Sequence, residues 1–227
     1  MTSSDRSRVV VAVVDSGVHA DHPHIGTVAG GVGFDQAGVS NDDYTDRLGH
    51  GTAVTAAIQD LAPDAVVWSL KIFDRTLETS FEALVAAIDW AGAHDVALVN
   101  LSLGTSEPAH AGPLRDAVRR VSGRTVVIAA GDHNGVAWLP GTLDGVLGVE
   151  LDWSCRRGSY TVGGTAVAPR LRTSGYPRPI PGVDPEHNLK GLSFAVAGMT
   201  GLAARAMAET GVRGYDALIG QLARRAC

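Results

Sequence analysis

Short apolar runs alternate with segments of helical period along most of the chain. The runs are rich in β-branched residues and span Val9–Val14, Ala65–Leu70, Val96–Leu101 and Arg124–Ala129. Helix-like segments lie between them, at Gly51–Leu61, Ser80–Gly92 and Pro113–Ser122. Strands that alternate with helices form parallel sheets with crossover connections. The pattern therefore predicts an α/β fold: a doubly wound, mostly parallel sheet with helices on both faces.

The last third of the chain has a different pattern. From Gly158 to Gly191 a Gly- and Pro-rich region lacks a clear period, which predicts loops and short strands without fixing their positions. Two helices are expected after it, a strongly apolar one over Ser193–Glu209 and an amphipathic one over Tyr215–Arg225. No repeat or linker divides the chain, and 227 residues suit one domain better than two. We expect residues 1–227 to form a single domain.

Composition and charge narrow the range of partners. Hydrophobic residues make up 45% of the chain and charged residues 19%, which is typical of a globular protein. The formal net charge is −5 and Lys and Arg gather only in pairs, so we expect no nucleic-acid partner. The longest apolar stretch, Phe194 to Ala204, falls well short of the ~20 residues that cross a membrane, so we expect no membrane partner.

The N-terminus and the cysteines bear on the cellular compartment. Met1 to Arg8 is polar and lacks the apolar core of a secretory signal. Cys155 and Cys227 are the only cysteines, which allows at most one disulfide and gives no zinc or redox spacing. Reduced thiols in a cytoplasmic protein are the simpler interpretation.

Three residues supply the chemical groups of nucleophilic catalysis. Asp15 follows the first strand, His50 opens a helix in Gly49–Thr52, and Ser193 opens another helix. A serine hydroxyl becomes a nucleophile when an imidazole takes its proton, and a carboxylate holds that imidazole in the correct tautomer. Each piece alone is also typical of a turn or a helix cap. Asp15 also lies at the end of a strand, where open α/β sheets bind ligands, so these three residues are candidates for a catalytic triad.

Six sequence blocks in one order resemble the subtilisin-like serine peptidases, or subtilases. The blocks are Val9–Gly17 with His22-Pro23, Asp46 with Gly49–Thr52, Leu61-Ala62-Pro63 leading to Lys71, Asn100–Gly104, Ala129–Asp132 and Gly191–Gly201. The resemblance covers nearly the whole chain and carries the family's triad in the order Asp, His, Ser.

The resemblance implies a role for each site residue. Ser193 would be the nucleophile, His50 the general base and then the general acid, and Asp15 the carboxylate that orients His50. Ser102, Leu103 and Gly104 would form an edge to which an extended peptide adds as a strand. Ala130 and Gly131 would also contact the substrate.

Two positions depart from the family pattern. The family places Asn after A-A-G to donate to the oxyanion, whereas this chain has Asp132, and an ionised carboxylate cannot donate. Asp132 would then act as a protonated donor, Asn134 would replace it, or the chain would be slow or inactive. At the floor of the primary side-chain pocket the family has a small residue, and this chain has Trp138. Trp138 either fills that pocket or turns away to pack in the core.

The leading expectation is a serine endopeptidase that cleaves an extended peptide or protein segment through an acyl-enzyme on Ser193. Nothing like a prosegment precedes Val9, so either one has been removed or this member folds unaided. Small subtilases of this kind resemble those that mature peptides inside the cell, including leader removal. The alternative is a pseudo-peptidase that binds a peptide or a partner protein without efficient hydrolysis.

No cofactor is expected, and calcium is left open. Oxygens that a Ca²⁺ ion can use come from Asn41, Asp42, Asp43 and Asp46, although acidic surface loops are usually only solvated. A second group, His19, Asp21, His22 and His24, follows the first strand as the family's His-Pro segment does, and we expect no metal there.

Overall fold

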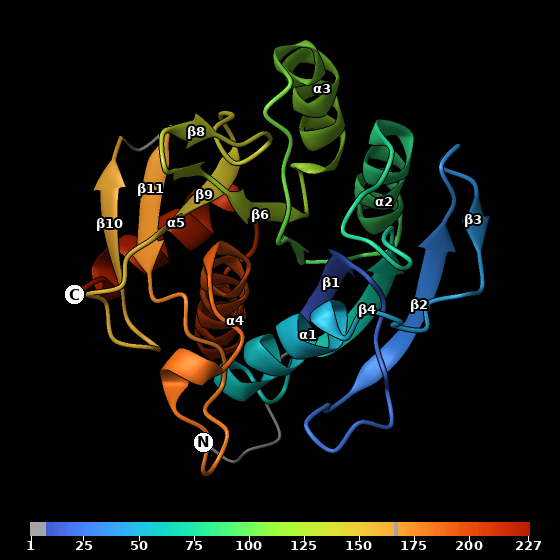
Figure 1. Ribbon diagram of the computed structural model, residues 1–227. Helices are drawn as coiled ribbons and strands as arrows, with labels where there is room; N and C mark the ends of the chain where they lie inside the picture. Colours follow the sequence, from blue (N-terminus) through green and yellow to red (C-terminus); the bar gives the residue numbers. More distant parts are fainter. Residues whose placement is uncertain (1–7, 166–167) are drawn as a thin grey trace.

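The computed structural model describes residues 8–165 and 168–227. Most of the polar N-terminal segment (1–7) and residues 166–167 of the Gly- and Pro-rich region lie outside the described residues. The described chain forms a nine-stranded sheet in the order β10-β11-β9-β6-β5-β1-β4-β2-β3 (Figure 1). In chain order its strands are β1 (Val10–Asp15), β2 (Val28–Phe34), β3 (Ser40–Asn41), β4 (Val66–Lys71), β5 (Leu98–Leu101), β6 (Val126–Ala130), β9 (Val146–Leu151), β10 (Tyr160–Gly164) and β11 (Pro169–Thr173).

Neighbouring strands from β11 to β2 pair in parallel, and only the edge strands β3 and β10 run antiparallel. Two further strands, β7 (Asp132–His133) and β8 (Val136–Ala137), form a separate antiparallel ribbon. The predicted mostly parallel α/β fold is therefore confirmed.

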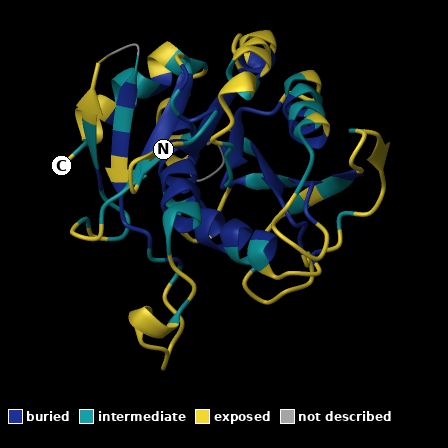
Figure 2. Cartoon of the chain, turned by 45° about the horizontal axis from the view of Figure 1, so that its top comes forward, coloured by how far each residue is buried: buried dark blue, intermediate teal, exposed yellow. Residues whose placement is uncertain are grey.

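Helices cover both faces of the sheet because the buried strands present apolar side chains on both sides. In β1, Val11 and Val13 pack in one hydrophobic cluster, whereas Ala12 and Val14 pack in the other. The first cluster includes α1 (His50–Leu61), α4 (Leu192–Thr210) and α5 (Tyr215–Arg225). The second includes α2 (Phe81–Ala93) and α3 (Ala111–Val121). Figure 2 shows the buried sheet and inner helices enclosed by exposed outer loops.

The sequence failed to predict β2, β3, β7, β8 and β9. Of these, β2 has the sequence Val-Ala-Gly-Gly-Val-Gly-Phe. Its glycines make room for large neighbours. A Cβ on Gly31 would lie 2.2 Å from the ring of Tyr44, and a Cβ on Gly30 would lie 2.8 Å from the ring of Trp68. Tertiary packing thus selects a strand where local propensity opposes one. Among residues 8–165 and 168–227, no helix is both long enough and apolar enough to cross a membrane.

Candidate active site

Asp15 is the last residue of β1 and lies at the carboxyl edge of the parallel sheet. Its side chain is 1% exposed, and Oδ1 accepts a hydrogen bond of 2.8 Å from the backbone N–H of Ser16. The same oxygen lies 2.7 Å from Nδ1 of His50. This bond fixes the ring with its proton on Nδ1, which leaves Nε2 free to accept a proton.

His50 is the first residue of α1, and the chain enters the helix through Gly49 with a φ of 81°. Burial alone would lower the pKa of His50, but the hydrogen bond to Asp15, the charge of Asp15 and the charge of Asp46 outweigh it and raise the pKa above its ordinary value. The imidazole also faces the ring of Phe194, with centroids 5.9 Å apart. His50 is therefore held next to the beginning of α4.

Asp46 lies in the loop before α1 and holds that loop against the end of β1, a role that the sequence did not reveal. Its buried carboxylate accepts hydrogen bonds from the Ser16 hydroxyl at 2.8 Å and from the Thr52 hydroxyl at 2.6 Å. It also accepts from the N–H groups of Leu48, Gly49 and Thr52. Burial alone would raise the pKa of Asp46, but these donors together lower it. One carboxylate thus ties the residue after Asp15 to the turn before His50.

Ser193 stands in the first turn of α4 and is joined to β5 by a chain of hydrogen bonds. Thr200 donates to the side chain of Asn100 at 2.9 Å, and Asn100 donates to Ser102 Oγ at 2.9 Å. Ser102 Oγ donates to the carbonyl of Ser193 at 2.9 Å, and Ser193 Oγ donates to the carbonyl of Ser102 at 3.1 Å. These bonds lock the predicted nucleophile to the predicted substrate-binding edge.

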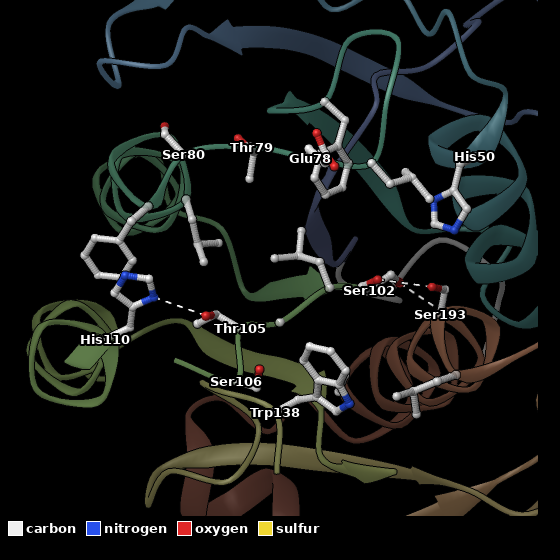
Figure 3. A pocket seen from close by; sticks show the side chains of 18 of the residues that line it. His50, Glu78, Thr79, Ser80, Ser102, Thr105, Ser106, His110, Trp138 and Ser193 are labelled. Carbon is white, nitrogen blue, oxygen red and sulfur yellow. Dashed lines mark hydrogen bonds between the residues drawn. The ribbon is translucent and has the colours of Figure 1, made fainter. Parts of the chain in front are cut away.

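His50 and Ser193 line one cavity of about 580 Å³, which runs along the edge at Ser102–Thr105 to a far end at His110 (Figure 3). In the structure as described, the Ser193 hydroxyl bonds to Ser102 and makes no hydrogen bond with His50. At the far end, His110 stacks on Phe81 with ring centroids 4.2 Å apart. The cavity thus extends from His50 and Ser193 along the predicted substrate-binding edge.

Most of the residues expected to bind substrate lie around this cavity. Its lining includes Ser102, Leu103, Gly104, Ala130 and Trp138, but Gly131 is not part of it. Trp138 is half-buried and packs against Gly104, where an added Cβ would lie 3.0 Å from the Cβ of Trp138. Trp138 also contacts the core cluster under α4. The sequence analysis left open whether Trp138 lies in the pocket or packs in the core. Its side chain does both, because it lines the cavity and also contacts the core.

Asp132 does not face this cavity. Its carboxylate lies 3.4 Å from a guanidinium nitrogen of Arg170 and lines a separate hollow with Glu150 and Asp152. The residue that lines the main cavity is its neighbour His133, which the sequence reasoning overlooked. Asn134 has a positive φ of 51° in the turn between β7 and β8. Of the three residues that follow Gly131, His133 is therefore the one that lines the main cavity, and all three line the separate hollow.

The loop considered for calcium uses its oxygens internally. The Asp43 carboxylate lies 2.7 Å from Arg47 and 3.1 Å from Lys71, and Asp46 is occupied as described above. Asn41 accepts from the backbone of Asp43. Within residues 8–165 and 168–227 no three His, Cys, Asp or Glu side chains cluster as a metal site. Three of the four residues considered for calcium, Asn41, Asp43 and Asp46, thus already use side-chain oxygens within the protein.

Comparisons with known proteins fix the family. The model of the subtilase family matches residues 6–170. The chain is a subtilase. Subtilisin DY of Bacillus licheniformis is 30% identical over 174 residues, 68% of this chain and 61% of that protein. Subtilisin E of Bacillus subtilis is 31% identical over 137 residues, 56% of this chain and 35% of that protein.

The subtilase spans less than two thirds of these curated relatives, and the family match ends before Ser193. Solved structures extend the likeness over nearly the whole chain. Sphericase has a TM-score of 0.78 at 25% identity and covers 97% of this chain, which in turn covers 84% of sphericase. The nisin leader peptidase NisP from Lactococcus lactis shares the fold, with a TM-score of 0.73 at 17% identity. The match covers 94% of this chain and 81% of NisP.

Proposed function

We propose that this subtilase is a serine endopeptidase with Asp15, His50 and Ser193 as its catalytic triad. The observation that carries the proposal is the 2.7 Å hydrogen bond between Asp15 and His50. His50 lines the same cavity as Ser193. The raised pKa of His50 suits a group that must take a proton from the nucleophile and later give it up.

In the proposed reaction an extended peptide pairs with the edge at Ser102–Gly104. The Ser193 hydroxyl turns from the Ser102 carbonyl to His50, attacks the scissile carbonyl carbon, and loses its proton to Nε2 of His50. The tetrahedral intermediate collapses as His50 gives that proton to the leaving amine, which leaves an acyl-enzyme. Water, activated by His50 in the same way, releases the acid and restores Ser193.

The proposed substrate class is an extended peptide or protein segment, and leader removal from a precursor peptide is one such reaction. A solved structure with this fold, NisP, is a leader peptidase. The free thiols Cys155 and Cys227 suit a reducing compartment, which favours a cytoplasmic enzyme that acts on peptides made in the same cell.

One observation favours a second candidate, a pseudo-peptidase that binds peptides without efficient hydrolysis. The Ser193 hydroxyl donates to the Ser102 carbonyl, so it has to rotate before His50 can activate it. An apo enzyme also tolerates such a geometry, because catalytic hydrogen bonds often form only with the substrate bound.

Labelling with a fluorophosphonate distinguishes the two candidates without knowledge of the substrate. The endopeptidase requires stoichiometric labelling of the wild type and none of Ser193→Ala. Ser106→Ala is the matched control, because Ser106 also lines the cavity but lies outside the triad, and it should be labelled like the wild type. A folded wild type that is not labelled, yet binds an extended peptide, would establish the pseudo-peptidase.

A further inference from the structure

The ribbon β7–β8 sorts the side chains of Asp132 and His133 to opposite sides. The ribbon pairs Asp132 with Ala137 and His133 with Val136, and successive side chains of a strand point to opposite faces. The Asp132 carboxylate is directed to Arg170, on β11. His133 borders the cavity that contains Ser193, Ala130 and Trp138, and it also borders the separate hollow that Asp132 lines. Of these two residues, only His133 lines the cavity that contains Ser193.

The neighbouring turn fixes which nitrogen of His133 can donate. Asn134 and Gly135 have φ values of 51° and 77°, the left-handed conformation that a two-residue hairpin turn requires. In this turn Nδ2 of Asn134 lies 3.2 Å from Nε2 of His133. An amide NH₂ group can only donate, so the tautomer that this contact favours accepts at Nε2 and carries its proton on Nδ1. His133 is left with one N–H donor on the nitrogen nearer the backbone.

We propose that Nδ1–H of His133 donates a hydrogen bond to the oxyanion of the tetrahedral intermediate, an inference that rests on the proposed peptidase function. When Ser193 Oγ bonds to the scissile carbon, the π electrons of the carbonyl move onto its oxygen and the serine proton passes to His50. The charge on that oxygen needs donors aimed at it in advance. The Ser193 N–H supplies one, since the first N–H groups of a helix have no intrahelical acceptor. His133 supplies the second.

With His133 as the second donor, Asp132 is not needed as a hydrogen-bond donor to the oxyanion. A carboxylate oxygen without a proton accepts hydrogen bonds and cannot donate one, and the Asp132 carboxylate lies beside the guanidinium of Arg170. Trp138 carries a competing donor, its indole N–H, because its side chain lines the same cavity (Figure 3). The experiment therefore has to separate three side chains, His133, Asp132 and Trp138.

The test measures second-order rate constants of fluorophosphonate inactivation, together with kcat and KM on a cleaved peptide. His133→Ala should lower kcat and the inactivation rate by about 10²–10³, the cost of losing one oxyanion donor in a subtilisin, with KM little changed. His133→Asn places an N–H at the position of Nδ1 and should recover most of the rate, whereas His133→Gln places it at Nε2 and should not. Val136→Ala, opposite His133 on the same ribbon, is the control and should behave as the wild type.

Each outcome supports or overturns the inference. Rates for folded His133→Ala within about threefold of the wild type would overturn it. A second outcome that would overturn it is that Trp138→Phe alone lowers kcat by the 10²-fold or more expected for an oxyanion donor. A third is that Asp132→Asn reacts faster than the wild type while the rates of His133→Ala are unchanged. A wild type that is never labelled would overturn this inference together with the proposed function, whereas a labelled wild type with an unaffected His133→Ala overturns this inference alone. Circular dichroism and thermal melting confirm that each variant is folded.

Discussion

Replacing Trp138 by glycine should widen the substrate preference of the proposed peptidase. The indole lies between the edge at Gly104 and the core under α4, so it occupies space that a substrate side chain would otherwise enter. The wild type is expected to prefer a small residue, such as Ala or Gly, before the scissile bond. Trp138→Gly is expected to accept Phe, Tyr or Leu there.

The magnitude follows from the apolar surface that the larger substrate side chain buries. Complete burial of a Phe or Leu side chain contributes about 1.5–3 kcal/mol, and each 1.4 kcal/mol is a factor of about ten. The ratio of kcat/KM for Phe over Ala should therefore rise by roughly 10- to 100-fold in the variant. Loss of a fully buried Trp costs about 3–5 kcal/mol of stability, and the half-buried Trp138 should cost less.

A peptide library cleaved by the wild type and the variant measures this ratio, with thermal melting to confirm folding. Trp90→Ala is the matched control, because Trp90 is also half-buried but stacks on His94 at 3.7 Å, away from the cavity. Its substrate preference should equal that of the wild type. A folded Trp138→Gly variant that keeps the small-residue preference would show that Trp138 acts only as a packing residue.

Three further predictions follow from the site. Asp15→Asn should keep the fold but lower kcat by about 10⁴, as in other triads, because the His50 tautomer is no longer fixed; unchanged kinetics would remove Asp15 from the site. His50 must be neutral to act as a base, so kcat/KM should rise with pH through a His50 pKa that lies above its ordinary value. Asp46→Asn removes a charge that raises this pKa, so the rise in kcat/KM should occur at lower pH in the pH–rate profile of the variant. A rise that stays at the same pH would exclude this coupling. Gly51→Ala should lower the melting temperature markedly, since its Cβ would lie 2.2 Å from the carbonyl of Gly17; an unchanged melting curve would contradict that geometry.

The sequence predicted the parts of the fold that local pattern determines. The buried parallel strands are continuous Val- and Ile-rich runs, so β1, β4, β5 and β6 lie within two residues of their expected positions. The glycine-rich β2 could not be predicted, because the rings of Tyr44 and Trp68 that pack on it come from outside the strand.

The candidate site likewise has parts that the sequence could predict and parts that depend on tertiary contacts. The pairing of Asp15 with His50 could be anticipated, because the resemblance to the family carries both residues as members of a triad. The face of the ribbon on which Asp132 or His133 lies depends on the residue at which the strand resumes after Gly131, and composition does not encode that. The five hydrogen bonds to Asp46 depend on tertiary contacts with Ser16 and on the shape of a loop.

The position of α4 in the chain sets the order in which the site is assembled during synthesis. Asp15 and His50 belong to the first quarter of the sequence, and the ribosome makes them long before α4. The proposed nucleophile is carried by α4, which packs in the core, so Ser193 can meet His50 only after the α4 segment has been made. Until then the nascent chain contains the proposed base without the proposed nucleophile, and it cannot form the acyl-enzyme.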